Sequence, residues 1–259
     1  MGDRKHYLIN QIVKYAQKLD QKGFGANHDG NISVKFEDVL LATPTAVSKG
    51  NVVEDIIITL DLDGKLLAGN GKPFSEIQLH LAAYKARDDI KAVVHAHPPF
   101  ATARGLVGKE LRPTLPEAIV SIGDLIPVVA FAMPGAKENV EIIASALAEG
   151  DVFMLPGNGV FAVGDSVEQA YLRLELVEHL AKIDYYTASL GQPMELSAEN
   201  LTKLLEKRAS IGLGPKKLKI LAQPAMERKT SASQLDSIKK IIADEIEKVL
   251  RTKGACLEL

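Results

Sequence analysis

The sequence predicts a fold of the α/β or α+β class, because segments with helical and strand periodicity alternate along the chain. Glycine, proline and Asx residues mark turns at many of the junctions between these segments. The first element is a helix over residues 4–22, in which apolar side chains recur at helical spacing from Tyr7 to Leu19. Gly23 and Gly25 follow and are expected to end this helix.

The next elements are expected to be strands of a sheet. Alternating apolar residues predict a hairpin over residues 32–42. Residues 54–60 read as another strand, and Asp61–Gly64 as the turn before a short strand at residues 65–68. A helix then opens at Ser75, since serine is a favoured N-cap residue.

The rest of the chain continues the same alternation. Strands are expected at residues 92–94, 126–131, 151–155 and 160–163, and helices at residues 101–111, 138–148, 166–190, 198–210 and 231–254. Pro134-Gly135 is read as a turn. In the helix over residues 138–148, Val140, Ile143 and Leu147 are expected to face the core.

The bulk composition bounds the kind of protein. A chain of 259 residues with 46% hydrophobic content can bury a sizeable core, as one large domain or as one domain with an appendage. A formal net charge of −2 gives no reason to expect nucleic acid or a membrane as partner. The single cysteine, Cys256, excludes a disulfide framework and a cysteine-based metal site, which is consistent with a cytoplasmic location. No secretory signal or membrane span is expected.

The stretch from Glu76 to His97 carries the chemistry. A helix is followed by the apolar strand at residues 92–94 and then by His95-Ala96-His97. Residues two apart on a strand point to the same face, so His95 and His97 can direct two imidazoles at one point. Histidine is the commonest neutral nitrogen ligand for zinc and similar metals. The spacing alone leaves a metal site and an ordinary polar strand end equally open.

Several segments match one known family in order and in spacing. They are GNISVK from Gly30, TPTAVSKG from Thr43, KPFSEIQLHLAAYKAR from Lys72, VVHAHPPFATA from Val93 and LPGNGVFAVG from Leu155. Over about residues 1–190 the chain therefore resembles the class II aldolase/adducin family, typified by L-fuculose-phosphate aldolase. The resemblance implies an α/β three-layer fold with a central, mostly antiparallel sheet flanked by helices. We assign residues 1–192 to this domain and residues 193–259 to a helical C-terminal extension.

The resemblance also implies that His95 and His97 hold a divalent metal, with zinc expected first. The family's third metal histidine sits in a turn that reads Gly157-Asn158-Gly159 here, so Asn158 stands at the position of the third ligand. An asparagine oxygen is neutral and binds zinc more weakly than imidazole does. His80 lies one turn after Glu76 on the same helix face, and we expect it to pack or to hydrogen-bond, with a substitute ligand as the alternative.

Glu76 is the residue that the resemblance makes the proton-transfer group. In a metal-dependent aldolase the metal polarises a ketone while a carboxylate moves a proton. A carboxylate near a metal and apolar walls can have its pKa moved toward the useful range. The alternative is an ordinary first-turn glutamate that complements the helix dipole.

Four residues are implied to hold a substrate phosphate, namely Asn31, Thr45, Ala46 and Ser75. Ala46 replaces a family glycine and retains only its N–H as a donor, and Phe74 replaces the first of two serines. Ser75 opens a helix, whose N-terminus can itself attract an anion. The alternative for Asn31 is that it only satisfies backbone groups of its own turn.

The leading hypothesis is therefore a metal-dependent aldolase that cleaves a small sugar phosphate, or a related hydroxy-ketone, through a metal-stabilised enediolate. The same family scaffold also carries epimerases, dehydratases and decarboxylases. A second hypothesis is a non-catalytic, adducin-like binding or assembly protein, which the loss of the third histidine at Asn158 favours. The resemblance further implies a homo-oligomer, expected to be a tetramer.

Overall fold

The computed structural model describes residues 2–130, 138–191 and 193–214. The contacts group Met1–Lys219 into one compact unit, and everything described below belongs to it. Its helices are α1 (Gly2–Gln21), α2 (Ile77–Ala86), α3 (Pro99–Leu106), α4 (Pro116–Ile122), α5 (Glu138–Glu149), α6 (Val167–Leu190) and α7 (Ala198–Ser210), with two short 3₁₀ turns, η1 (Lys49–Asn51) and η2 (Glu54–Ile56). The predicted domain boundary at residues 192 and 193 stays a prediction.

A single antiparallel sheet forms the centre of this unit. Its strands are β1 (Asn31–Phe36), β2 (Val39–Ala42), β3 (Ile58–Leu60), β4 (Leu66–Ala68), β5 (Ala92–Ala96), β6 (Val152–Met154) and β7 (Val160–Gly164). Their order across the sheet is β4-β3-β2-β1-β5-β7-β6, and every neighbouring pair is antiparallel. The α/β fold with a mostly antiparallel sheet flanked by helices is confirmed.

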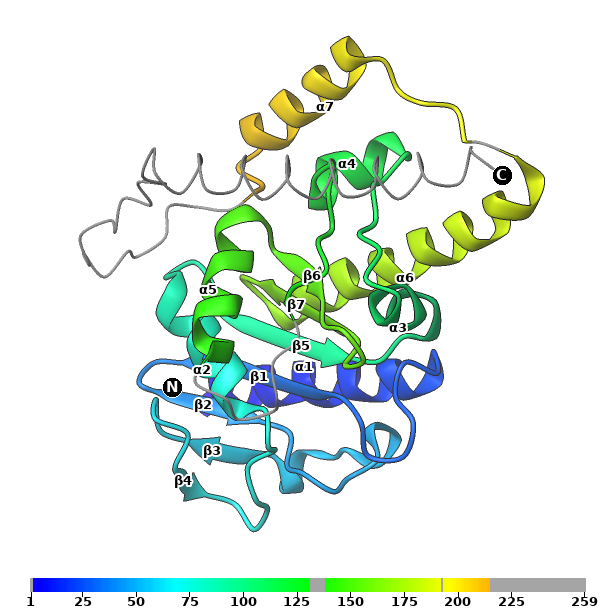
Figure 1. Cartoon of the computed structure of the whole chain (residues 1–259). Coiled ribbons are helices and arrows are strands. Elements are labelled where there is room, and N and C mark those ends of the chain that lie inside the picture. The colour runs from blue at the N-terminus through cyan, green and yellow to red at the C-terminus, as the bar shows by residue number, and fades with distance from the viewer. Residues whose placement is uncertain (1, 131–137, 192, 215–259) are drawn as a thin grey trace, which may run out of the picture. The chain divides into compact units, whose positions relative to one another are not determined.

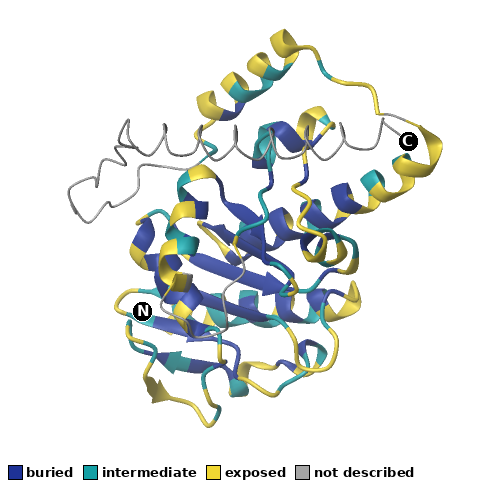
Figure 2. Ribbon diagram, viewed as in Figure 1, coloured by how far each residue is buried: buried dark blue, intermediate teal, exposed yellow. Residues whose placement is uncertain are grey.

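Helices cover both faces of the sheet, so β1, β5, β6 and β7 are buried over most of their length (Figures 1 and 2). On one face, strand residues such as Ile32 and Val94 pack in a core with α1, α3, α4 and α6. On the other face, Val93, Phe153 and Phe161 pack with α2 and α5. Alternate residues of each strand therefore belong to different cores, as the period of two requires.

Several predicted elements differ from the observed ones. Residues 54–60 do not form one strand, because Glu54–Ile56 is the 3₁₀ turn η2 and only Ile58–Leu60 pairs in the sheet. The expected strand at residues 126–131 is also wrong as far as Ala130, since Ile126 and Val128 make only isolated bridges. Pro127 between them has no N–H to donate to a ladder. Val140 is 46% exposed rather than inward-facing, whereas Ile143 and Leu147 are buried as predicted.

Two other predictions, the turn at Pro134-Gly135 and the helix at residues 231–254, lie outside the described residues. The long helix that starts after Ser166 is confirmed, and the Ser166 hydroxyl accepts a hydrogen bond from the N–H of Gln169 as an N-cap. The helix over Ala198–Ser210 is confirmed as α7.

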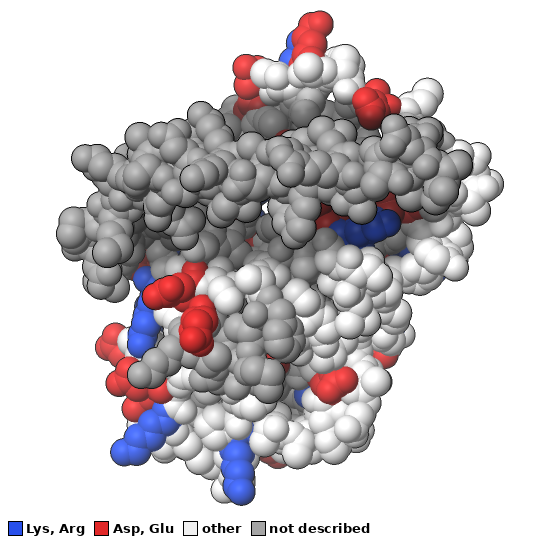
Figure 3. All heavy atoms as spheres, viewed as in Figure 1, with Lys and Arg blue, Asp and Glu red and all other residues white. Residues whose placement is uncertain are grey.

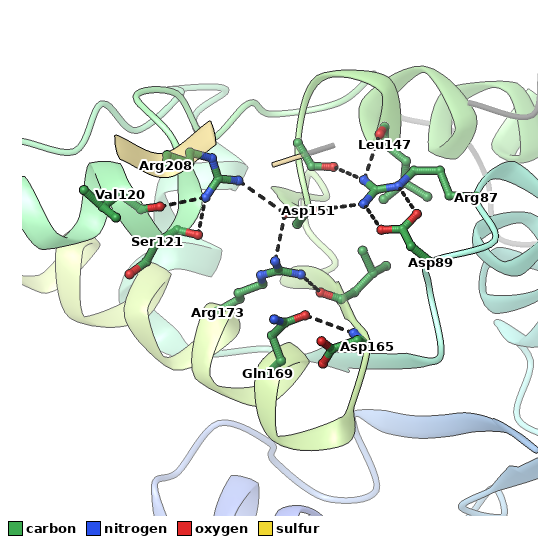
Figure 4. A network of polar contacts seen from close by, with 12 residues as sticks. Arg87, Asp89, Val120, Ser121, Leu147, Asp151, Asp165, Gln169, Arg173 and Arg208 are labelled. Carbon is green, nitrogen blue, oxygen red and sulfur yellow. Dashed lines mark hydrogen bonds and ion pairs between the residues drawn. The ribbon is translucent and has the colours of Figure 1, made fainter. Parts of the chain in front are cut away.

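A buried carboxylate joins four elements of the unit (Figure 4). Asp151, fully buried just before β6, lies 2.8 Å from Arg87, 2.9 Å from Arg173 and 3.3 Å from Arg208. These arginines come from the end of α2, from α6 and from α7 respectively. Arg208 also donates to the carbonyl oxygens of Val120 and Ser121 in α4. This network fixes α7 to the unit.

The surface shows no concentration of one sign of charge on the face drawn in Figure 3, where the described acidic and basic side chains are interspersed. Among the described helices, none combines the length and the apolar character needed to cross a membrane.

Candidate active site

The register of three strands brings the candidate residues together at one end of the sheet. Asn31 of β1 lies opposite His95 of β5, and His95 lies opposite Phe161 of β7. Directly opposed residues share a face, so Asn31 and His95 both point toward the α2 layer. This face and this end of the sheet carry the site.

Glu76 occupies the N-cap position of α2 and extends over the same face. Its Oε2 accepts a hydrogen bond from Asn31 Nδ2 at 3.0 Å and lies 2.9 Å from His95 Nδ1. Its Oε1 accepts a hydrogen bond from Asn158 Nδ2. Ser75 is exposed and is not the N-cap, so the predicted cap was wrong by one residue. The backbone instead turns at Glu76, which directs the carboxylate inward.

The pKa of Glu76 moves opposite to the expected direction. Burial alone would raise it, but the adjacent His95 and the hydrogen bonds from His95, Asn158 and Asn31 lower it below its ordinary value. The expected upward shift assumed apolar walls, whereas the walls here are polar donors. Glu76 is therefore an ionised carboxylate held by three partners.

His95 uses both ring nitrogens, and its side chain is only 1% exposed. Its Nε2 donates to the backbone carbonyl of Asn158 at 2.7 Å, while Nδ1 faces the Glu76 carboxylate. Both of these partners are acceptors, although the donor Asn31 Nδ2 also lies 3.4 Å from Nδ1. Burial would lower the pKa of His95, but the charge of Glu76 and these hydrogen bonds raise it. The contacts with Glu76 and Asn158 therefore favour the protonated ring of His95.

The turn that carries Asn158 packs directly on the histidine segment. A Cβ added at Gly159 would lie 2.1 Å from the carbonyl oxygen of Ala96 and 2.6 Å from the His97 ring. Gly159 also has a φ of 72°, in the left-handed region that favours glycine. The glycine is thus required for Asn158 to reach both Glu76 and His95.

His97 lies just beyond β5, with its ring beside that of His95. Its ring centroid is 5.1 Å from that of His95, and its Nδ1 is 3.3 Å from Asp29 Oδ2. Its Nε2 is buried and has no hydrogen-bond partner. Burial and the neighbouring His95 lower the pKa of His97. A buried nitrogen without a geometric hydrogen-bond partner is a place where an ion or a water molecule can bind, and the Asn158 side chain lies near enough to raise the pKa of His97.

The donor types fit a divalent metal. The unpaired Nε2 of His97 stands beside His95, Glu76 and the Asn158 side chain, which together offer nitrogen and oxygen donors. In the described part of the chain, however, no three His, Cys, Asp or Glu side chains stand ready to hold a metal ion. His95 would have to release a proton and one of its two partners before it could ligate. The metal assignment therefore stays a prediction.

Of the four residues expected at a phosphate, Thr45, Ala46 and Ser75 lie on two adjoining loops, whereas Asn31 lies in β1 and its amide contacts Glu76 and His80. The N–H of Thr45 donates to the carbonyl of Lys72 at 3.0 Å, which joins the loop of Thr45 and Ala46 to the segment that ends at Ser75. Thr45, Ala46 and Ser75 are exposed. Ala46 has a φ of 60°, a conformation that favours the glycine it replaces. Phe74 is buried and packs on His80 instead of facing this surface.

Two residues near the site escaped the sequence analysis. Asp29 contacts His97, as described above. Lys49 is 3% exposed and donates from Nζ to the carbonyls of His28 and Val47, which ties together the loops on either side. Burial lowers its pKa to about 8, although Asp29 and Asp20 oppose the shift. The only available signal was their position, since Asp29 directly precedes the GNISVK motif and Lys49 lies within the TPTAVSKG motif.

Comparison with known proteins identifies the family. The model of the class II aldolase and adducin N-terminal domain matches residues 10–185. The fold is that of the class II aldolases, and the chain belongs to the class II aldolase and adducin family.

Its relatives include named sugar-phosphate aldolases. It is 31% identical to L-fuculose phosphate aldolase of Escherichia coli over 81% of this chain and 97% of that protein. It is 28% identical to 5-deoxy-D-ribulose 1-phosphate aldolase of Bacillus thuringiensis over 78% of this chain and 95% of that protein. A solved structure of L-fuculose 1-phosphate aldolase superposes with a TM-score of 0.71 at 28% identity, over 77% and 95% of the two chains.

Proposed function

We propose that the protein is a metal-dependent aldolase that cleaves a small ketose phosphate. The observation that carries the proposal is the cluster in which Glu76 contacts His95 and Asn158 while the ring of His97 lies beside that of His95, with His97 Nε2 buried. One relative and one similar solved structure are named for 1-phosphorylated ketoses, which supports this substrate class.

In this proposal His95 and His97 hold the metal, with Asn158 as a further oxygen donor. A bound divalent cation, zinc first, supplies the positive charge that polarises a ketone carbonyl. Glu76 moves the proton: it would accept one from the hydroxyl group on the carbon that leaves as an aldehyde, the electron pair of the broken C3–C4 bond would pass to the ketone oxygen as an enediolate, and Glu76 would return the proton to C3. Its three hydrogen-bond partners hold the carboxylate in place for this step.

The phosphate of the substrate is proposed to bind at the loops that carry Thr45, Ala46 and Ser75, with Asn31 at the start of β1 as the fourth proposed contact. These loops adjoin each other through the Thr45 to Lys72 hydrogen bond, and Lys49 braces them from inside. Backbone N–H groups and hydroxyls are the donors available there. Lys72, at the exposed surface, adds a cation near the same place.

A direct test uses a product that both substrates share. Cleavage of the C3–C4 bond of L-fuculose 1-phosphate or of 5-deoxy-D-ribulose 1-phosphate releases dihydroxyacetone phosphate. Untagged protein, stripped with chelator and reloaded with zinc, cobalt or manganese, is expected to release it, as detected by coupled NADH oxidation with glycerol-3-phosphate dehydrogenase. Glu76→Gln is the matched control and should abolish release. A protein that releases none with any of the metals would refute aldolase activity on these ketoses.

An assembly or binding role is the second candidate. Asn158 replaces a ligand, and Glu76 and His95 satisfy each other without a metal, as a non-catalytic member would need. A protein that stays metal-free after incubation with zinc, cobalt and manganese would favour this role. Consumption of substrate without dihydroxyacetone phosphate would instead favour an epimerase, dehydratase or decarboxylase. We also propose a cytoplasmic homotetramer, to be checked by fractionation and by sedimentation.

A further inference from the structure

A chain of buried polar groups runs beneath the candidate site between α2 and β1. The Tyr84 hydroxyl lies 2.8 Å from Ser33 Oγ, and Ser33 Oγ lies 2.7 Å from His80 Nδ1. His80 Nε2 lies 2.7 Å from Asn31 Oδ1, and Asn31 Nδ2 donates to Glu76 Oε2 at 3.0 Å. The first four residues are buried, and His80 and Ser33 are 0% exposed.

This series of hydrogen bonds follows from the residue spacing on strand β1 and on helix α2. Asn31 and Ser33 are two apart on β1 and share a face, while His80 and Tyr84 are one turn apart on α2. The His80 ring packs between two aromatic rings, with centroids 4.8 Å from Phe74 and 5.4 Å from Phe161. These rings exclude water and fix the orientation of the imidazole, so its hydrogen bonds must be made within the chain.

The directions of these hydrogen bonds can be assigned. Burial lowers the pKa of His80 to about 3, so at neutral pH the ring has one proton. Asn31 Oδ1 can only accept, which places that proton on Nε2 and leaves Nδ1 as an acceptor. Ser33 therefore donates to His80 and accepts from Tyr84.

The opposite orientation of the Asn31 amide is excluded because it would leave two acceptors facing each other. If the Asn31 amide were flipped, its Oδ1 would face the Glu76 carboxylate, and two acceptors would meet without a proton between them. All donors and acceptors in this series of hydrogen bonds are satisfied only when each group donates to the next one toward Glu76. The ionised carboxylate of Glu76 is then the last acceptor.

We propose that His80 is a positioning residue for Glu76, which acts by holding the Asn31 amide with its N–H directed at the carboxylate. The consequence is that the proton-transfer group is fixed between His95 and Asn158 by a partner that touches neither substrate nor metal. This inference rests on the proposed role of Glu76. The inference also argues against His80 as a substitute metal ligand, because its two ring nitrogens are hydrogen-bonded to Ser33 and Asn31.

Two substitutions of similar chemistry distinguish positioning from packing. The Gln side chain in His80→Gln places an amide near the Nε2 position and can still donate to Asn31, whereas that in His80→Asn reaches only the Nδ1 position near Ser33. Both lose the ring contacts with Phe74 and Phe161. We expect kcat for L-fuculose 1-phosphate to stay within a few-fold in H80Q and to fall about 10- to 100-fold in H80N, with a smaller change in KM. Tyr84→Phe should lower the melting temperature and leave kcat unchanged.

Equal kcat values for the two His80 variants would overturn the proposal, since packing alone predicts equality. A second measurement does not depend on activity. In protein labelled with ¹⁵N-histidine, the His80 resonances, assigned by their loss in H80Q, are expected to report the Nε2–H tautomer from pH 5 to 9. The Nδ1–H tautomer, or titration near pH 6.5, would overturn the assignment. If the aldolase assay fails for the wild type, the proposed function fails, and the tautomer alone decides whether His80 orients Asn31.

Discussion

Asn158 donates a hydrogen bond from its side-chain amide to Glu76 Oε1, while Glu76 Oε2 lies 2.9 Å from His95 Nδ1. Both oxygens of the candidate catalytic carboxylate are thus engaged by residues that the family pattern places at a metal. The amide of Asn158 supplies a donor to Glu76. An imidazole at this position, as the resemblance to the family leads us to expect, would instead supply a lone pair to a cation.

Asn158→His is therefore expected to raise the affinity for zinc by about tenfold or more, because it adds an imidazole next to His95 and His97. The measurement is competition with a chromophoric chelator at fixed pH. Asn158→Gln is the control, since it keeps an amide and adds no ligand. An unchanged dissociation constant in N158H would mean that the turn cannot direct a ring at the metal.

His95→Ala should sharply lower the metal content per chain, because it removes one of the two imidazoles that the proposal assigns to the metal. Mass spectrometry of untagged protein measures the content directly. His28→Ala is a matched control, since His28 is an exposed loop histidine close in sequence to Asp29. Equal metal content in H95A and wild type would remove His95 from the ligand set.

The sequence predicts that Glu76, His95 and Asn158 lie close together, and the structure brings these three residues into contact, while their roles stay predictions. The period of two on a strand placed His95 and His97 on one side, and the glycine turn at Asn158 was recognisable from its motif. The hydrogen-bond role of His80 was also predicted and is confirmed by its contacts with Ser33 and Asn31.

What escaped prediction depends on long-range contacts. The partners of Asp151 are drawn from residue 87 to residue 208, and no local pattern indicates which arginine will reach it. The position of Lys49 is equally hidden, because a buried lysine has no sequence signal of its own. The strand predicted at residues 126–131 had the right apolar character, but apolar runs do not reveal whether a neighbouring strand is available to pair with.

Lowering the pH should destabilise the protein through His80. Its pKa is about 3 in the folded protein and near 6.5 when unfolded, so between these values the unfolded chain binds more protons. The free energy of unfolding therefore falls as pH falls below 6.5, by up to about 3 kcal/mol at pH 4. Urea unfolding of wild type and of His80→Gln across pH 4–7 measures this. The difference in free energy of unfolding between wild type and His80→Gln should become smaller as the pH is lowered. A difference that stays constant across this pH range would contradict the lowered pKa of His80.

Ala46→Gly is expected to stabilise the protein by up to about 1 kcal/mol, because a φ of 60° strains any residue with a Cβ. Urea unfolding is again the measurement. Ala103→Gly is the contrasting control, since this residue lies inside helix α3 and should lose about 1 kcal/mol. A loss of stability in both variants would indicate that the loop at Ala46 carries no strain.

Asp151→Asn should be among the most damaging single substitutions in the described part of the chain. Asp151 is fully buried and provides the carboxylate that Arg87, Arg173 and Arg208 share. Asparagine has almost the same shape but no charge, and would leave these arginines under-compensated in a buried region, at a cost of about 3–5 kcal/mol. Urea unfolding measures this loss of free energy of unfolding. If the loss is so large that the variant does not fold, the yield of folded protein is the measurement instead.

Arg208→Met provides the graded comparison, because it removes one cation and leaves Asp151 with two (Figure 4). It should cost less than Asp151→Asn, and its main effect should be to loosen α7, which Arg208 ties to Asp151 and to the carbonyls of α4. Hydrogen exchange of α7 amides should therefore rise in R208M while the sheet amides stay protected. A D151N protein as stable as wild type would show that the three arginines do not depend on this carboxylate.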